Sequence, residues 1–443
     1  MLNNYSMKGG LRREALAVAT ASPEVSRNVG YDLTILADGK DIKIRVVESV
    51  SIVRDFNSKI TDSIKIVFNI PAGVYIEDVK PFKNNLKAKL KHTTPGLTSI
   101  DEYKLIIALE DKNIAADSIK GKKSSLDNGM LTIHAECVDE SVLFLKQQNK
   151  GITIKDGTVG SAMIAALDAA LVKVTSKFGI RKDPIHMVPP DNERVYKYVV
   201  IPATMKTLDV GIYLQEKLGG VYNGSINNYF YRENNTLKSF IFPLYRSNLL
   251  KSTGRKLIII SASDITTGAI NTTYSVDAND DLRILVMQKE KLDDDNIEML
   301  GKGGAIKGID ANTVRGRPVT ISQSGVELKK KSMYRNMKEN LADDLSDIIN
   351  IEPTDNFYEP RSKILKNKLA KVTVEWNHSN FRLVHPYMPV IFLEETNGKV
   401  VMREGMVNGL NSMTIVGGKQ ETTVLSILIT KRENSANKPV RLF

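Results

Sequence analysis

Residues 207–245 read TLDVGIYLQEKLGGVYNGSINNYFYRENNTLKSFIFPLY, which predicts a short helix, a glycine stop and two strands in one run. Thr207 can cap the start of a helix, and Gly219-Gly220 supply the left-handed backbone conformation that ends one. Aromatic and branched residues follow on both sides of the polar run 233–236, as in a loop that joins hairpin strands. The pattern predicts scaffold and gives no sign of a reaction centre.

The size and composition of the chain indicate a protein with several cores. It has 443 residues, of which 42% are hydrophobic and 26% are charged, so we expect roughly two to four globular domains. Cys137 is the only cysteine, which excludes a disulfide within one chain and a metal cluster held by several cysteines. We therefore expect synthesis in a reducing cytoplasm.

Two stretches resemble membrane or targeting segments, but both are too weak. Residues 159–172 are apolar, yet Ser161 and Asp168 interrupt them and they are shorter than the ~20 residues that span a bilayer. Residues 15–21 are mostly alanine, which is a poor apolar core for a secretion signal. We expect no membrane insertion, and we interpret residues 1–30 as an N-terminal arm that docks onto another part or partner.

The net charge of +11 is compatible with nucleic acid or with acidic protein partners. Lysines and arginines are spread over several modest clusters, and acidic runs alternate with these clusters. Few aromatic residues lie among the lysines, where they could stack on bases. A nucleic-acid-binding protein with a dispersed basic surface therefore stays as one alternative hypothesis.

Residues 31–150 have the pattern of an antiparallel sheet with one buried face. Polar and apolar residues alternate in 41–46 and in 64–70, and Asp38-Gly39 is a strong signal for a tight hairpin turn. Further strands are expected at residues 86–90, 103–107 and 131–137. We interpret this stretch as one β domain.

Residues 151–202 are expected to form a helix followed by a connector. Thr158 is a good N-cap, apolar residues recur at helical spacing as far as Phe178, and Gly179 can end the helix. Three prolines in residues 183–190 then impose an extended chain and exclude a second helix.

Residues 203–325 are interpreted as a second β domain that carries one helix. In this interpretation the hairpin of the opening stretch shares a domain with two apolar strands, at residues 256–261 and 282–287. The predicted fold class is therefore a β-rich, multidomain α+β protein.

The last part of the chain is divided into a connector and a strand-rich end. Residues 326–372 are a helical and basic connector, with apolar residues at helical spacing in 333–350. Residues 373–443 are a small β meander or barrel, with turn signals at 397–398 and 417–418. Strands are expected at residues 370–376, 381–385, 388–393, 400–403, 413–416 and 423–430.

Templates for phosphate and calcium binding fail. The glycine-rich run 300–308 (LGKGGAIKG) matches neither a P-loop nor a dinucleotide fingerprint, so we interpret it as a loop. Residues 277–282 have carboxylates at calcium-like spacing but lack the glycine and glutamate of an EF-hand loop. An acidic turn before a strand explains them better.

Histidines and the cysteine give no catalytic pattern either. No H-E-x-x-H motif occurs, so a zinc site of histidines with Asp or Glu in one chain is disfavoured but stays open, as does a histidine site at an oligomer axis. His134 and Glu136 fall on the solvated parity of their strand, so Cys137 is interpreted as an inert core thiol. We assign no catalytic, cofactor-binding or metal-binding residue and expect no cofactor. A hydrolase hidden in a β domain stays as a second alternative. The five histidines are His92, His134, His186, His378 and His385.

The order of these parts resembles the baseplate hub, or central tail hub, proteins of bacteriophages with long tails. The resemblance lies in the order and character of short motifs, and it covers most of the chain. The segments that carry it are YDLTI at 31–35, SIVRDF at 51–56, IPAG at 70–73, GVYNG at 220–224, FIFPLY at 240–245 and HPYMP at 385–389.

The resemblance implies a structural, non-enzymatic protein of the virion. Such hubs are homotrimers in which two tube-like antiparallel β-barrel domains per subunit form a pseudo-sixfold ring. The ring joins the tail tube above to the central spike below and lets DNA pass without sequence-specific binding. Residues 31–150 and 203–291 would be the two barrel domains of this chain. The net charge of +11 departs from the expectation for a lumen that repels DNA, so the positive charge would face acidic neighbours outside.

Overall fold

The computed structural model describes the larger part of the chain, including both strand-rich ends of the sequence. The described residues are 15–19, 30–94, 97–110, 129–218, 220–222, 226–243, 254–261, 273–286, 288–291, 309–313, 318–322, 325–327, 349–351, 369–396, 399–415 and 421–430.

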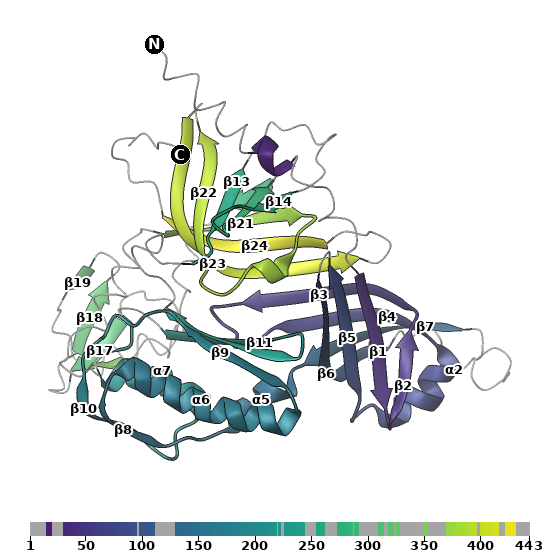
Figure 1. The fold of residues 1–443 in the computed structure, drawn as a ribbon, viewed down its shortest axis with the longest axis horizontal. Helices are drawn as coiled ribbons and strands as arrows, with labels where there is room; N and C mark the ends of the chain where they lie inside the picture. Colours follow the sequence, from purple (N-terminus) through teal and green to yellow (C-terminus); the bar gives the residue numbers. More distant parts are fainter. Residues whose placement is uncertain are drawn as a thin grey trace, which may run out of the picture.

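One large sheet runs through the molecule and joins two barrel-like units (Figure 1). It has 15 strands, and the order along its main path is β14-β15-β13-β22-β23-β3-β4-β7-β6-β5-β1-β2. We call strands β1 to β7 the first unit, and strands β13 to β16 together with β21 to β24 the second unit. A helical unit, residues 139–243, lies between them in the sequence.

The first unit follows the chain strand by strand. Its sheet curls until β1 contacts β3 and β2 contacts β4, so that the alternating apolar residues form a closed interior. The predicted turn at Asp38-Gly39 is confirmed, with φ values of 46° and 79° that match a type I′ hairpin. The strands are β1 (Gly30–Ala37), β2 (Lys40–Ile44), β3 (Val46–Asp55), β4 (Ser63–Pro71), β5 (Lys87–Thr94), β6 (Leu97–Glu110) and β7 (Met130–Val138).

A short helical segment packs against the core of the first unit. It begins with α2 (Ala72–Val74), continues as the π-helix η2 (Tyr75–Val79) and ends with the 3-10 turn η3 (Lys80–Phe82). Tyr75 and Val79 are fully buried in that core. The sequence pattern did not predict this segment.

The helical unit is organised around α6 (Val159–Phe178). The predicted boundaries of this helix are confirmed, because Thr158 forms a capping box with Ser161 and Gly179 ends the helix at φ 62°. By length and composition alone α6 could cross a membrane, but its apolar stripe is buried in the core of this unit. The other elements are α5 (Glu140–Gln147), β8 (Ile152–Gly157), β9 (Arg181–Met187), β10 (Tyr196–Ile201), η4 (Thr207–Asp209), α7 (Val210–Lys217), β11 (Ile226–Glu233) and β12 (Thr236–Pro243).

Two expectations for the opening stretch are corrected. The hydroxyl of Thr207 caps no helix, because it donates to the carbonyl oxygen of Gln148 and holds η4 against the end of α5. The hairpin β11–β12 exists, with Asn234 and Asn235 at positive φ in its turn, but it does not share a sheet with β13 to β15. It pairs in parallel with β9, the extended segment that the prolines predicted.

The second unit is assembled from two distant stretches of the chain. Strands β13 and β15 come from residues 257–286, and they join the C-terminal strands through the parallel pairing of β13 with β22. The expected all-antiparallel pairing is therefore wrong for β13, which is parallel to both of its neighbours. The strands are β13 (Leu257–Ser261), β14 (Tyr274–Val276), β15 (Leu282–Val286), β16 (Gln288–Lys291), β21 (Leu369–Asn377), β22 (Pro389–Thr396), β23 (Lys399–Ile415) and β24 (Glu421–Thr430).

Two local predictions in this unit are also wrong. Residues 400–403 and 413–416 were expected in separate strands, whereas residues 399–415 form the single 17-residue strand β23. Residues 381–385 were expected to be a strand, but Phe381–Leu383 form the 3-10 turn η9. The turn signals at 397–398 and 417–418 lie outside the described residues.

A small four-stranded sheet branches off between the two halves of the second unit. The helix expected at 333–350 lies mostly outside the described residues, and its last two residues belong to a strand of this sheet. The glycine-rich run 300–308 also lies outside the described residues. The strands are β17 (Ile309–Thr313), β18 (Pro318–Ser322), β19 (Gly325–Glu327) and β20 (Ile349–Ile351).

The long strand β23 forms the seam between the two units. Its first half pairs with β22 of the second unit, its last part pairs with β3 of the first unit, and β24 follows its other edge. Gly409 lies where the pairing passes to β3, and a Cβ atom there would lie 2.6 Å from the carbonyl oxygen of Arg54. The close approach at this point therefore needs glycine.

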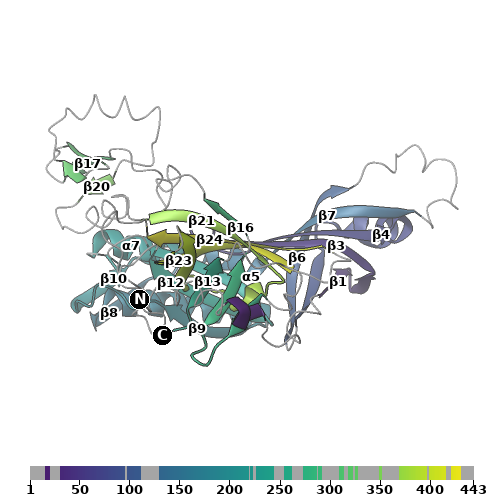
Figure 2. The ribbon, with the colours of Figure 1, turned by 90° about the horizontal axis from the view of Figure 1, so that it is seen from above.

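One face of the sheet, which we call the open face, has exposed side chains in both units. Figure 2 shows how the strands of this sheet run through the molecule. The strands from β7 to β21 lie along one side of the molecule, and the helical unit lies on the other side. Paired residues cross this face in a row from β6 to β23. The row consists of Ile106, Glu136, Lys65, Ser51 and Met413.

Candidate functional site: a buried polar junction

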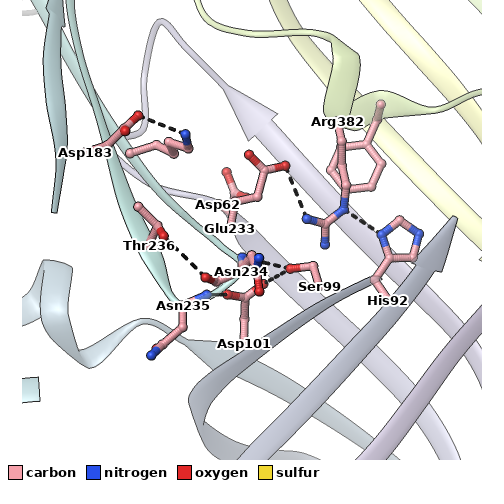
Figure 3. Close-up of polar contacts among 12 residues, drawn as sticks. Asp62, His92, Ser99, Asp101, Asp183, Glu233, Asn234, Asn235, Thr236 and Arg382 are labelled. Carbon is pink, nitrogen blue, oxygen red and sulfur yellow. Dashed lines mark hydrogen bonds and ion pairs between the residues drawn. The ribbon is translucent and has the colours of Figure 1, made fainter. Parts of the chain in front are cut away.

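The most polar part of the interior lies where the two units meet the hairpin β11–β12 (Figure 3). We call it the polar junction. The side chains come from both units, from the hairpin and from the loop after β3, so the site exists only when all these parts are folded together. Its members are Arg54, Asp62, His92, Ser99, Asp101, Tyr229, Glu233, Arg382 and Glu421.

A buried ion pair ties the seam strand β3 to the hairpin. Nε of Arg54 lies 3.2 Å from Oδ2 of Asp62, and both side chains are nearly inaccessible. The Tyr229 hydroxyl donates to Oδ1 of the same carboxylate at 2.9 Å. Burial raises the pKa of Asp62, and the Arg54 charge and the Tyr229 hydrogen bond act in the opposite direction.

Aromatic rings complete the environment of the Arg54 guanidinium. Its Cζ atom lies 4.0 Å from the ring centre of Tyr231 in the hairpin and 4.9 Å from that of Phe381 in η9. Cation–π contacts are strongest where the cation is desolvated, as it is here. One arginine of the first unit therefore contacts both the helical and the second unit.

His92 of β5 is bonded to residues of the second unit. Nε of Arg382 donates to Nδ1 of His92 at 2.7 Å, and Nε2 of His92 lies 3.4 Å from Oε2 of Glu421. Its ring stacks on Tyr31, with a centroid distance of 4.3 Å. Burial lowers the pKa of His92, because a charged imidazole loses its hydration here.

The turn of the hairpin is held from both sides. The backbone amides of Asn234 and Asn235 donate to Ser99 Oγ and to Asp101 Oδ1, each at 2.8 Å. On the opposite side, Arg382 reaches Oε1 of Glu233 at 3.3 Å. The type I′-like turn thus docks on β6 and on η9 at once (Figure 3).

The junction has no room for a substrate. Its cavity has a volume of about 10 Å³, at the lower limit of the space that one water molecule needs. Arginine, carboxylate and histidine side chains already contact one another across it, and no described cysteine or lysine lines it. The arrangement can hold three parts of the chain together, but its geometry offers no open position for a reacting molecule.

The residues considered from the sequence lie elsewhere, with the exception of His92. Burial raises the pKa of Cys137 to about 12, which makes it a poor nucleophile and confirms the core-thiol interpretation. His134 and Glu136 are exposed on the open face, as predicted. His186 contacts Asp183 at 3.0 Å, and the described residues contain no group of three potential metal ligands.

The acidic turn at 277–281 is also confirmed as structural. The Asp277 carboxylate accepts the backbone amides of Asn279 and Asp281 and contacts the guanidinium of Arg283 at 2.9 Å. These hydrogen bonds lower the pKa of Asp277 against the effect of its burial. Hydrogen bonds within the turn therefore occupy the Asp277 carboxylate oxygens, which a calcium site would need as ligands.

The polar junction is not predicted from the sequence, although the sequence contains a signal for it. Arg54 follows Val50 and Ile52 on the buried parity of β3, and His92 follows Ala88 and Leu90 on the buried parity of β5. A charged or titratable residue at a buried position needs a partner, because its burial is otherwise costly. The partners Asp62 and Arg382 carry no comparable signal, because neither lies in a regular strand.

Comparison with known proteins finds relatives only among solved structures. No family model matches the sequence, and no curated protein matches it. A tail protein from Neisseria meningitidis has a TM-score of 0.43 at 12% identity, over 91% of this chain and 97% of that one. The 43 kDa tail protein of prophage MuSo2 from Shewanella oneidensis has a TM-score of 0.45 at 10% identity, over 90% of this chain and 96% of that one.

A third similar structure comes from a secretion machine. It is a component of the Escherichia coli type VI secretion system, described as similar to bacteriophage tail proteins, with a TM-score of 0.40 at 9% identity over 92% of this chain and 79% of that one. The first two neighbours are described as tail proteins, and the third is described as a component of a secretion system.

Proposed function

We propose that this chain is a structural component of a phage tail, specifically the baseplate hub. Three copies would form a ring in which the first and second units of each chain alternate, giving six barrel-like segments around one channel. The observation that carries the proposal is the seam, because β23 makes the two units parts of one uninterrupted sheet. A ring wall requires this continuity, whereas two separate globular domains would not need it.

The open face of the sheet supports a channel wall that does not hold DNA. Among the five paired residues that cross it, Lys65 and Glu136 carry opposite charges and lie 4.0 Å apart, and the other three are uncharged. Affinity for the phosphate backbone grows with the number of unpaired cations that contact it. Because the two charges of this row balance, the row offers passing DNA no unpaired cation.

The proposal also places the chain in the virion. The ring would contact the tail tube protein on one side and a spike or other baseplate protein on the other, after synthesis in the cytoplasm of the host bacterium. The polar junction has a structural role here, since it fixes the angle between the two units of each subunit. No residue is assigned to catalysis or to a cofactor.

The mass of the purified protein in solution tests this function. Native mass spectrometry should find a species of three times the 49.2 kDa of one chain. A chain that stays monomeric at all concentrations and never enters tail particles would contradict it. Titration with DNA at rising salt concentration tests the nucleic-acid-binding alternative. A measurable affinity for DNA that falls steeply with salt would favour that alternative.

A further inference from the structure

His92 is the one histidine of the polar junction, and the groups around it act on its protonation in opposite directions. The Arg382 guanidinium and the Glu421 carboxylate contact different nitrogens of its ring, and both come from the second unit. The ring itself belongs to β5 of the first unit, and only about 1% of its side chain is accessible. Its protonation state therefore bears directly on a contact between the two units.

The hydrogen bond to Arg382 fixes the neutral form of the ring. An arginine side chain is always protonated and can only donate, so Nδ1 of His92 must be the acceptor at 2.7 Å. The ring proton then lies on Nε2, which faces Oε2 of Glu421 at 3.4 Å. When both ring nitrogens carry protons, the Nδ1–H group of His92 points at the Nε–H group of Arg382, so two donors face each other. The ring is then positively charged and lies beside the positive charge of Arg382.

The other groups around the ring come from three strands of the first unit and from η9. Tyr31 of β1 stacks on one side of the ring and stays protonated, because burial raises its pKa well above the ordinary value. Phe381 of η9 lies at a centroid distance of 5.8 Å. Asp101 of β6 favours the charged ring, and Arg54 of β3 lines the same cavity with its charge already paired to a carboxylate.

We propose that His92 is a proton-sensitive latch between the two units. At neutral pH its Nδ1 accepts from Arg382 and holds η9 on β5. In acid the protonated ring loses Arg382 and keeps Glu421 as its counter-charge, so the Arg382 side chain leaves β5, whereas the Phe381 amide of η9 stays bonded to Oε1 of Glu421. Because Arg382 also contacts Glu233, the same protonation loosens the hairpin turn from η9. Acid thus loosens one contact between the units without unfolding either of them.

Hydrogen exchange of the full-length protein tests the latch. Protection of the backbone amides in residues 379–388 should fall between pH 7.5 and about pH 5, after correction for intrinsic exchange, because the contact of Arg382 with His92 is lost. Residues 130–138 of β7 serve as the internal reference and should not change. Equal protection of residues 379–388 at both pH values would overturn the proposal.

Two variants separate the latch from general acid sensitivity. In His92→Asn the side-chain oxygen can take the place of Nδ1 as acceptor but cannot be protonated, so residues 379–388 should stay protected at both pH values. In His134→Gln, an exposed histidine of the same unit is removed and the acid response should match that of the wild type. An acid response that survives in His92→Asn would contradict the latch.

A third variant keeps the test decisive if His92→Asn does not fold. Arg382→Lys retains the positive charge but lacks the Nε–H group, so residues 379–388 should exchange rapidly at both pH values. A wild-type-like loss of protection in acid in this variant would show that the response does not depend on the contact between Arg382 and His92.

Discussion

The two barrel-like units are built from the chain in opposite ways. In the first unit seven strands follow one another within residues 30–138, and most of them are joined by short connections. The second unit combines residues 257–291 with residues 369–430, so β13 finds its partner β22 more than a hundred residues away. Both nevertheless share one sheet and one hydrophobic core.

This difference indicates how the seam forms. The second unit can close only after both of its halves are present, and loop closure of that length carries an entropic cost that local hairpins avoid. The completed first unit offers the edge of β3 as a template for β23. We therefore expect the first unit to support the second, and the predictions below test how strongly the two are coupled.

The largest expected loss of stability comes from a cavity created in the core of the first unit. A fluorescent residue of the second unit reports this loss. Phe68 is fully buried, and Phe68→Ala should lower the free energy of unfolding by about 3–5 kcal/mol. Trp376, the only tryptophan, lies in the second unit but in the same core cluster. Urea unfolding followed by its fluorescence should therefore shift together with the far-UV circular dichroism.

The exposed neighbour Lys65 on the same strand provides the control, and Lys65→Ala should leave both transitions nearly unchanged. A fluorescence transition that stays in place in Phe68→Ala, while the dichroism transition shifts, would mean that the units unfold independently.

A comparable loss is expected from the ion pair at the seam. Asp62→Ala leaves the Arg54 guanidinium buried without its carboxylate, which typically costs about 3–5 kcal/mol. The double variant Arg54→Met with Asp62→Ala should recover part of this loss, because no unpaired charge remains buried. Thermal unfolding of the wild type and the two variants measures the difference, and equal stability of the single and double variants would contradict this explanation.

A smaller loss of stability is expected from a substitution at the seam, which should uncouple the unfolding of the two units without changing either core. Gly409→Val places a side chain against the Arg54 carbonyl and should cost about 1–3 kcal/mol by overpacking. The fluorescence and dichroism transitions, coincident in the wild type, should then separate. Gly30→Ala is the matched control, because nothing lies within 4 Å of a Cβ atom at that position. Coincident transitions in Gly409→Val would mean that the seam does not couple the units.

The smallest expected effect is the dependence of stability on pH. Burial lowers the pKa of His92 and of His385, so the folded protein binds fewer protons than the unfolded chain below the ordinary histidine value of about 6.5. The contribution of these two histidines to the free energy of unfolding is fully present above about pH 7. It is lost as the pH falls from there towards the pKa of the histidines in the folded protein. The carboxylates with lowered pKa, such as Asp277, lose their contribution only below about pH 4.

Urea unfolding at about pH 7.5 and about pH 5 should therefore show the lower stability in acid. Burial raises the pKa of Asp62, which acts with the opposite sign, so the comparison is made in Asp62→Asn, where this carboxyl group is absent. Stability of Asp62→Asn that rises towards pH 5 would contradict the sign of both histidine shifts.

The first unit and α6 could largely be predicted from the sequence, because their signals are local. The turn at Asp38-Gly39 and the caps Thr158 and Gly179 each act within a few residues, and the structure confirms all three. Strand alternation likewise placed Cys137 inside and His134 outside.

The second unit and the polar junction could not be predicted in the same way. A strand pattern contains no information about a partner such as β22, which is distant in the sequence, and β13 was therefore assigned to the wrong neighbours. The junction residues Asp62 and Arg382 lie in a loop and a 3-10 turn, where periodicity says nothing about burial. Arg54 and His92 were detectable as polar residues at buried positions, but their partners were not.

End-on electron microscopy of the assembled protein tests the central claim most directly. If β23 makes the two units of each chain neighbouring parts of one wall, averaged views should show a threefold ring with six similar segments around an open channel. Particles with twofold symmetry, or single chains without a ring at concentrations where the protein enters tails, would contradict the account.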